Sequence, residues 1–143
     1  IHSLRDGEEV DEWETVMTIE GDYADFAHLE TIYLGILARQ SRIATNVRRV
    51  VKAANGKPVL FFPARYDIYQ TQESDGYAAW VGGIHGFSTD ANALAAGGKG
   101  LGTIPHALIA SYKGDTVAAT EAFDKYVDPS IARIALVDFD TTA

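Results

Sequence analysis

The chain has 143 residues, a net charge of −8, 47% hydrophobic and 22% charged residues, and no cysteine. This composition indicates a folded domain rather than a disordered segment, and it excludes disulfides and thiolate metal sites. The acidic balance argues against a general nucleic-acid surface, which needs clustered Lys and Arg. No apolar run approaches the ~20 residues that span a bilayer, and the start lacks the apolar core of a signal peptide. We therefore expect a soluble, cytoplasmic protein that binds neither nucleic acid nor membrane.

The N-terminal part is acidic and turn-rich over residues 1–22. Apolar alternation at 16–19 predicts strands of a small β element there. Apolar residues then recur at helical spacing and predict a helix over 23–37. We expect Ser41 to cap a second helix, and Asn55-Gly56 to end that helix in the left-handed conformation.

The rhythm changes at residues 59–62, a wholly apolar run typical of a strand covered on both faces. Further strands are expected near 83–87 and 134–137, and helices at 70–80, 90–96, 105–111 and 116–126. Strand–helix alternation of this kind predicts an α/β fold with a parallel sheet or barrel. The predicted strands amount to about half of an eight-stranded barrel.

The last predicted strand ends in Asp138-Phe139-Asp140. In α/β units such a strand normally leads into a helix, so we expect the chain to be incomplete. The alternative is a final edge strand that simply ends there.

Polar residues follow each predicted strand, where parallel α/β folds place their sites. These positions are Arg65 and Tyr66, then Ser88, Thr89 and Asp90, then Thr103 and His106, then Asp138 and Asp140. Such a set suits a substrate that carries several anionic and hydroxyl groups.

The glycine-rich stretch 97–103 allows two interpretations. It matches neither G-x-x-x-x-G-K-[ST] nor G-x-G-x-x-G. It either offers backbone N–H groups to a phosphate, with Lys99 adding charge, or is a flexible loop.

Arg42 and His106 also allow two interpretations each. Arg42 is the member of a basic helical cluster that we expect in a site, although such clusters are usually solvated faces. A lone histidine such as His106 is more often structural, but Asp138 could hydrogen-bond one ring nitrogen and orient the other.

Other chemistries lack their patterns. The four histidines have no zinc-ligand spacing, and no G-x-S-x-G elbow is present for a serine hydrolase.

An ordered set of segments resembles the nicotinate phosphoribosyltransferases of the archaeal and bacterial type. The segments are 19–21, 29–31, 43–46, 61–65 (FFPAR), 87–92 (FSTDAN), 102–107 (GTIPHA) and 135–140 (ALVDFD). The resemblance implies an irregular α/β barrel of the type II phosphoribosyltransferase kind. Residues 1–22 would belong to a β-rich N-terminal domain, and residues 23–143 would form the first part of the barrel.

The resemblance also implies an activity, the joining of nicotinate to the ribose of phosphoribosyl pyrophosphate, with Mg²⁺ as cofactor and ATP as co-substrate. His106 matches the histidine that ATP phosphorylates, and Asp138 matches the aspartate that supports it. Arg65 matches an arginine at the base and pyrophosphate site, and Thr89 and Asp90 match the lining of the pyridine pocket. The remaining substrate-binding candidates are Arg42, Ser88, Lys99, Thr103 and Asp140.

Family members continue into an aspartate-rich segment and a phosphate loop that this chain lacks, so a complete site would need a longer chain. The alternatives are a quinolinate or nicotinamide phosphoribosyltransferase, or a non-catalytic half-barrel fragment. We expect a homo-oligomer or completion by a second chain.

Overall fold

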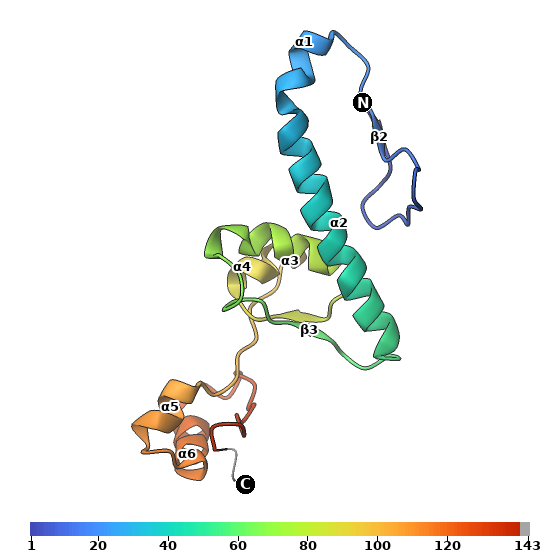
Figure 1. Cartoon of the computed structure of the whole chain (residues 1–143). Helices are drawn as coiled ribbons and strands as arrows, with labels where there is room; N and C mark the ends of the chain where they lie inside the picture. The colour runs from blue at the N-terminus through green and yellow to red at the C-terminus, as the bar shows by residue number, and fades with distance from the viewer. Residues whose placement is uncertain (141–143) are drawn as a thin grey trace. The chain divides into compact units, whose positions relative to one another are not determined.

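The computed structural model describes residues 1–140, which form two compact units (Figure 1). The first unit comprises residues 1–100, and the second begins at Leu101. The domain boundary expected after residue 22 stays a prediction.

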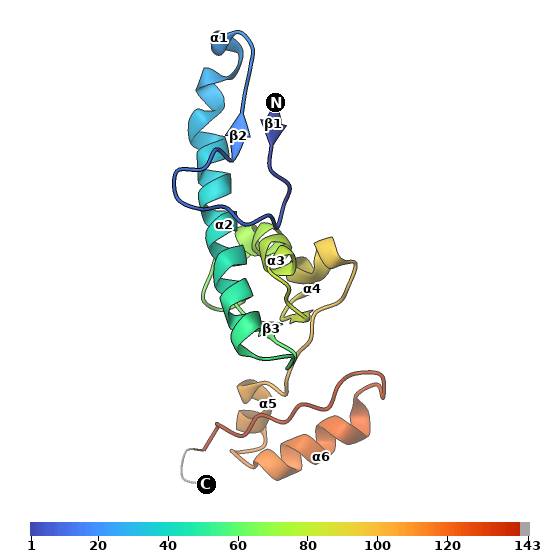
Figure 2. The ribbon, with the colours of Figure 1, turned by 90° about the vertical axis from the view of Figure 1, so that its right-hand side faces the viewer.

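The first unit begins with a short antiparallel pair, β1 (His2–Ser3) and β2 (Met17–Thr18). The β element expected in residues 1–22 is therefore confirmed. The intervening acidic loop carries Trp13, which is fully exposed and has φ = 72°. This segment lies beside the long helix α2 in both ribbon views (Figures 1 and 2).

Side chains from two helices fasten that loop. Arg48 of α2 donates to the Gly7 carbonyl at 3.1 Å and pairs with Glu9 at 3.3 Å. The Tyr77 hydroxyl donates to Asp6 at 2.5 Å, and this hydrogen bond raises the pKa of Tyr77.

The helical region begins at α1 (Tyr23–Phe26), where the Asp22 carboxylate accepts from the Ala24 N–H as a cap. It continues through η1 (Ala27–Leu29) into α2 (Glu30–Ala53). The break expected at Ser41 is wrong, because α2 is one 24-residue helix and Ser41 is an exposed residue within it. The half-buried and buried positions 33, 37, 40, 44, 47, 51 and 54 recur at three- and four-residue spacing without a shift in phase. After the helix, Asn55 and Gly56 both adopt positive φ, as expected.

Two parallel strands follow, β3 (Leu60–Phe61) and β4 (Gly86–Phe87). Between them lie η2 (Tyr69–Thr71) and α3 (Gln72–Val81), and after them α4 (Asp90–Ala93) and η3 (Leu94–Ala96). The helices expected at 70–80 and 90–96 are confirmed, as is the parallel direction of the strands. In residues 1–140 this sheet has two strands and no closed barrel. The fold is therefore mixed α/β, and the barrel stays an expectation.

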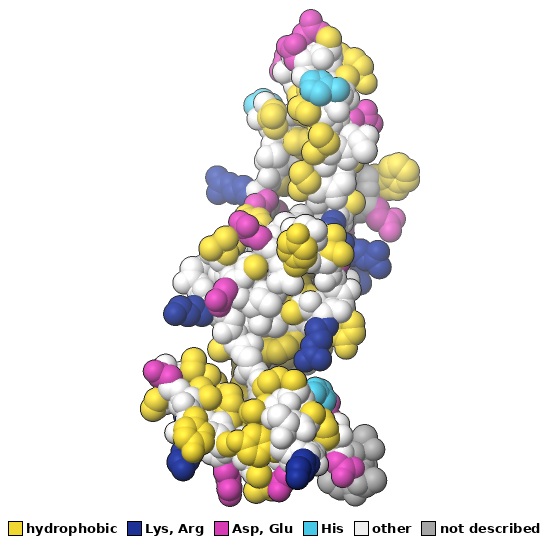
Figure 3. Space-filling view, turned by 90° about the vertical axis from the view of Figure 1, so that its left-hand side faces the viewer, with side chains coloured by type: hydrophobic (Ala, Val, Ile, Leu, Met, Phe, Trp, Pro, Cys, Tyr) yellow, Lys and Arg dark blue, Asp and Glu magenta, His cyan; other side chains and the backbone are white. Residues whose placement is uncertain are grey.

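The core of the first unit joins α2, α3, the two strands and α4 through Val47, Ala79, Ile84, Phe87 and Ala93. Cover on both faces of residues 59–62 was expected but is absent in this structure, since Leu60 is 41% and Phe62 43% exposed. Hydrophobic side chains remain on the surface of both units (Figure 3).

The second unit contains α5 (His106–Ser111) and α6 (Thr116–Tyr126), as expected, around a core of Ile104, Ile109 and Ala119. Asp115 caps α6 by accepting from the Ala118 N–H at 2.9 Å. The strand expected at 134–137 is not formed in the described residues; a single main-chain bond, from Ile104 N–H to the Ile134 carbonyl at 3.0 Å, connects this segment. Across residues 1–140, no helix combines the length and apolar character needed to cross a membrane.

Candidate functional site

The carboxyl end of β3 leads into a tight turn that carries Arg65. The Pro63 carbonyl accepts from the N–H groups of Tyr66, at 2.8 Å, and Asp67, at 3.2 Å. Arg65 is exposed, and its guanidinium makes no hydrogen bond or ion pair with any residue from 1 to 140. A free guanidinium at a strand end is suited to bidentate binding of a phosphate or carboxylate.

The carboxyl end of β4 leads into a second turn, Ser88–Asp90, which begins α4. Thr89 is the N-cap of α4, since its hydroxyl accepts from the Asn92 N–H at 3.1 Å. The Asp90 carboxylate accepts from the Gly100 N–H at 2.7 Å and so ties the glycine-rich stretch to this turn. Because β3 and β4 are paired in parallel, the turns after them lie at the same edge of the sheet.

A buried amide network lies beneath the second turn. Asn92 is fully buried, and its Oδ1 is 2.9 Å from the Thr89 hydroxyl and 3.3 Å from the Ser88 hydroxyl. Its Nδ2 donates to the Gln72 carbonyl at 2.7 Å. Thr89 also lies 2.8 Å from Gln72 Oε1. A hydroxyl has one proton, so Thr89 donates to one of these two amide oxygens at a time.

An ion-pair network supports the first turn. Arg39 donates to buried Asp75 through Nε at 2.8 Å and Nη2 at 2.7 Å, and Nη2 also reaches Asp67 at 2.5 Å. Burial, the largest single influence, raises the pKa of the Asp75 carboxyl, but the hydrogen bonds from Arg39 and Thr71 and the charge of Arg39 together outweigh it and hold this pKa below its usual value. Hydrogen bonding to Asp75, with a further bond to Asp67, raises the pKa of Arg39. Asp67 lies two residues after Arg65, so the network anchors the turn that presents Arg65.

The second unit brings His106 and Asp138 together. His106 Nε2 lies 3.4 Å from Asp138 Oδ1, and the side chains are 44% and 70% exposed. The Phe139 ring lies 6.1 Å from the His106 ring, between centroids. At 3.4 Å the contact is long, and both partners are open to water, so it orients the imidazole more than it stabilises the fold.

The other expected site residues have less defined surroundings. Arg42 and Lys99 are exposed. The Thr103 hydroxyl donates to the adjacent Ile104 carbonyl at 3.4 Å, and Asp140 is exposed. The structure thus groups the expected residues as Arg65 with the Ser88–Asp90 turn in one unit, and His106 with Asp138 in the other.

Sequence reasoning missed Arg39, Asp75, Gln72 and Asn92. Arg39 stands three positions before Arg42 in the same helix, and nothing in its local sequence distinguishes it. Asp75 and Asn92 could have been suspected as polar residues on otherwise apolar helix faces, but their partners are separated from them by between 3 and 36 residues.

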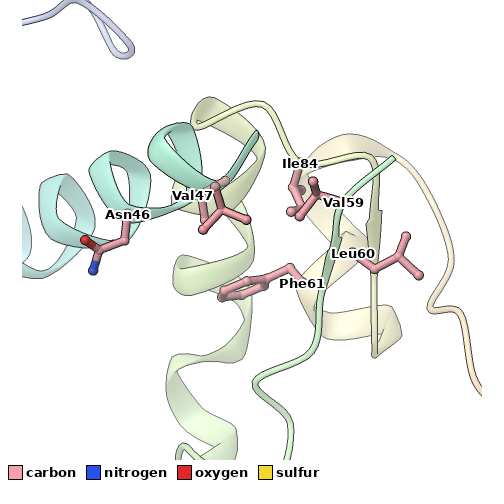
Figure 4. A pocket seen from close by; sticks show the side chains of 7 residues that line it. Asn46, Val47, Val59, Leu60, Phe61 and Ile84 are labelled. Carbon is pink, nitrogen blue, oxygen red and sulfur yellow. The ribbon is translucent and has the colours of Figure 1, made fainter. Parts of the chain in front are cut away.

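Neither Arg65 nor the Ser88–Asp90 turn lines either of two hollows that lie in the first unit. One, of about 190 Å³, is apolar and lies between α2 and the strands (Figure 4). Val47, Val59, Leu60, Phe61 and Ile84 are among the residues that line it, and the side chains of Leu60 and Phe61 point in opposite directions. The other, of about 1330 Å³, lies between the N-terminal loop and helices α2 and α3 and is lined by side chains of both charges.

Metal ions in proteins are commonly held by clusters of ligand side chains. Residues 1–140 contain no group of three or more His, Cys, Asp or Glu side chains that could hold a metal ion. Proteins often bind Mg²⁺ through one or two carboxylates together with substrate phosphates, so Mg²⁺ stays an expectation.

Comparison with known proteins identifies the relatives of this arrangement. Residues 2–41 match the family described as quinolinate phosphoribosyl transferase, N-terminal domain. A solved structure, nicotinate-nucleotide pyrophosphorylase from Pyrococcus furiosus, superposes with a TM-score of 0.76 and 44% identity, over 82% of this chain and 30% of that one. The chain is similar to part of the pyridine phosphoribosyltransferases.

Two curated phosphoribosyltransferases extend the similarity. Nicotinate phosphoribosyltransferase of Bacillus subtilis is 30% identical over 98% of this chain and 28% of its own length. Nicotinate phosphoribosyltransferase pncB1 of Mycobacterium tuberculosis is 30% identical over 75% of this chain and 25% of its own. The chain thus spans between 25% and 30% of the proteins that it matches. These relatives support the phosphoribosyltransferase likeness and leave the pyridine base open.

Proposed function

We propose that this chain is part of a nicotinate phosphoribosyltransferase, which forms nicotinate mononucleotide and pyrophosphate. The observation that carries the proposal is the similarity to the Pyrococcus furiosus enzyme, with 44% identity over 82% of the chain. The nicotinate phosphoribosyltransferases of two bacteria support it.

The reaction breaks the bond between ribose C1 and the pyrophosphate oxygen and forms a bond from C1 to the pyridine nitrogen. Both negative charge on the leaving group and positive charge on the ribose develop in the transition state. Catalysis therefore depends on neutralising the pyrophosphate and aligning the base, with little need for a general acid or base. Arg65, exposed and without a partner among residues 1–140, follows β3 and is the residue we assign to an anionic group of the substrate. The Ser88–Asp90 turn at the end of β4 would border the pyridine base.

His106 is proposed as the acceptor of a phosphoryl group from ATP. In that step the bond between the γ-phosphorus and ADP breaks, and a bond to an imidazole nitrogen forms. Asp138 faces Nε2 at 3.4 Å, so Nε2 would carry the proton and Nδ1 would be the nucleophile. Lys99, Thr103, Arg42 and Asp140 stay proposed substrate contacts.

A quinolinate phosphoribosyltransferase is the second candidate. The match of residues 2–41 to the N-terminal domain of that family favours it. Quinolinate has a second carboxylate, so its site would need one more cation than a nicotinate site.

The deciding experiment gives the full-length protein phosphoribosyl pyrophosphate with nicotinate, quinolinate or nicotinamide, and separates the products by chromatography. We expect nicotinate to have the highest kcat/KM, with pyrophosphate formed in equal amount. Preference for quinolinate, with carbon dioxide released, would favour the second candidate. No mononucleotide from any base would contradict both and favour a non-catalytic fragment. The mass of the native species would show whether a second copy or another chain completes it.

A further inference from the structure

The Asn92 side chain is fully buried, and both polar atoms of its amide have hydrogen-bonding partners that lie outside α4. Its Oδ1 faces the hydroxyls of Ser88 and Thr89, and its Nδ2 donates to the Gln72 carbonyl of α3. A buried amide is tolerated only when such partners are present. Thr89 alone caps α4, so the Asn92 side chain serves the junction between the turn and α3 rather than α4 itself.

The proton and one lone pair of the Thr89 hydroxyl are used within this junction. It accepts from the Asn92 N–H, and its one proton goes to an oxygen of Asn92 or of Gln72. The Thr89 hydroxyl therefore holds the turn in place and has no proton left to donate to a ligand. Ser88 is held less tightly, since its hydroxyl lies 3.3 Å from Asn92 Oδ1, and it keeps lone pairs for another group.

Two glycines hold the turn at fixed distance from its neighbours. A Cβ at Gly76 of α3 would lie 2.1 Å from the Asn92 carbonyl oxygen. A Cβ at Gly100 would lie 2.7 to 2.9 Å from the Thr89–Asp90 peptide. These contacts are between main chains, which cannot rotate away as side chains do. The turn is therefore wedged between α3 and the glycine-rich stretch, and Asn92 is the buried side chain that ties it to α3.

We propose that Asn92 is a positioning residue that holds the Ser88–Asp90 turn in the geometry required for the pyridine base. The proposal rests on the proposed function, because it gives that turn a ligand. A displaced turn loses contacts that the base makes equally in the ground state and in the transition state. Loss of the amide therefore raises the KM for the base more than it lowers kcat.

The test uses Asn92→Ala and Asn92→Asp in the full-length protein. Asn92→Asp keeps the oxygen that faces Ser88 and Thr89 but loses the donor to Gln72. We expect the KM for nicotinate to rise about tenfold or more in both variants, because Asn92→Asp places a buried carboxyl group against the Gln72 carbonyl, with kcat within about threefold of wild type. Val47→Ala is the matched control, because it also truncates a buried side chain of the first unit, but Val47 belongs to α2 and its side chain has no hydrogen bond to lose. An equal rise of KM in Val47→Ala would overturn the proposal, since general destabilisation would then explain it.

A second measurement separates this proposal from the proposed function. Amide hydrogen exchange at residues 88–92 and at Gly100 should accelerate about tenfold or more in Asn92→Ala and stay near wild type in Val47→Ala. Wild-type protein that transfers no phosphoribosyl group to any base contradicts the proposed function, and exchange then decides whether Asn92 holds the turn. Unchanged exchange in Asn92→Ala overturns the positioning role in either case.

Discussion

Arg39 grips both carboxylate oxygens of Asp75, through Nε at 2.8 Å and Nη2 at 2.7 Å, across 36 residues of sequence. The pair joins α2 to α3. Because Nη2 also reaches Asp67, it joins both helices to the turn that carries Arg65. The Asp75 side chain is 2% exposed and the Arg39 side chain 42%. Loss of the ion pair would therefore cost the buried carboxylate more free energy than the partly hydrated guanidinium.

Arg39→Ala should destabilise the first unit by about 3 kcal/mol, since it leaves a buried carboxylate unpaired. The pH dependence has a defined sign. The pKa of Asp75 is lower in the folded than in the unfolded chain, so its stabilisation is present above the unfolded value of about 3.9 and is lost as the pH falls through the folded value. Without Arg39 the folded pKa rises, and acid unfolding should begin at higher pH. Chemical denaturation at several pH values measures both effects.

The control for that pair is Asp75→Asn combined with Arg39→Ala. If the cost arises from an unpaired charge, the double variant should be more stable than Arg39→Ala alone. Equal stability of the two would show that the charge of Asp75 is not the cause.

Gly76→Ala and Gly35→Ala form a matched pair of helix substitutions. A Cβ at Gly76 collides with the Asn92 main chain, and we expect a loss of about 3 kcal/mol in the free energy of unfolding. A Cβ at Gly35, within α2, meets nothing within 4 Å, and we expect a gain of about 1 kcal/mol from helix propensity. Urea denaturation should show that the free energy of unfolding falls in Gly76→Ala and rises in Gly35→Ala. A change of the same sign in both variants would contradict the close approach of α3 to α4.

Arg65→Lys keeps the charge but removes the planar fork of donors. If Arg65 binds phosphate or carboxylate with two hydrogen bonds, kcat/KM should fall by about 2 kcal/mol, near thirtyfold. Steady-state kinetics of the full-length variant measure the fall. Arg49→Lys, at an exposed position of α2, is the control and should change little. Parameters of Arg65→Lys within about twofold of wild type would remove Arg65 from the site.

ATP should label His106 of the full-length protein with acid-labile phosphate on Nδ1, which phosphorus NMR distinguishes from Nε2. His106→Ala should abolish the label and the stimulation by ATP but retain some basal transfer, because the phosphoryl group does not attack the ribose. His28→Ala, at another exposed histidine, should still be labelled. Acid-labile phosphate that is still found on the His106→Ala protein would contradict the assignment of His106 as the phosphorylated residue.

Local patterns of the sequence predicted most helices and both parallel strands, since capping residues and apolar spacing act over a few positions. Thr89 and Asp115 cap α4 and α6 in this way. The same local reasoning failed at Ser41, where a possible cap was outweighed by an apolar stripe that continues from Leu37 to Val47. Residues 134–137 have strand-like composition, but a strand also needs a partner along its length, and here one main-chain bond connects it.

The candidate site was only partly predictable. Positions after strands pointed to Arg65 and the Ser88–Asp90 turn, because topology places such residues at one edge of a sheet. The supports beneath them, Arg39 with Asp75 and Gln72 with Asn92, depend on how α2, α3 and α4 pack. That packing is fixed by contacts between distant segments, which a single sequence does not reveal.

Both tryptophans of the chain, Trp13 and Trp80, belong to the first unit. Trp13 is fully exposed in the N-terminal loop, and Trp80 of α3 is 47% exposed. Intrinsic tryptophan fluorescence therefore follows residues 1–100, and its change on denaturation comes mainly from Trp80. Unfolding of α5 and α6 would leave the tryptophan fluorescence unchanged, while the helical circular dichroism signal at 222 nm decreased. Different midpoints from the two probes are therefore the result expected if the two units unfold separately.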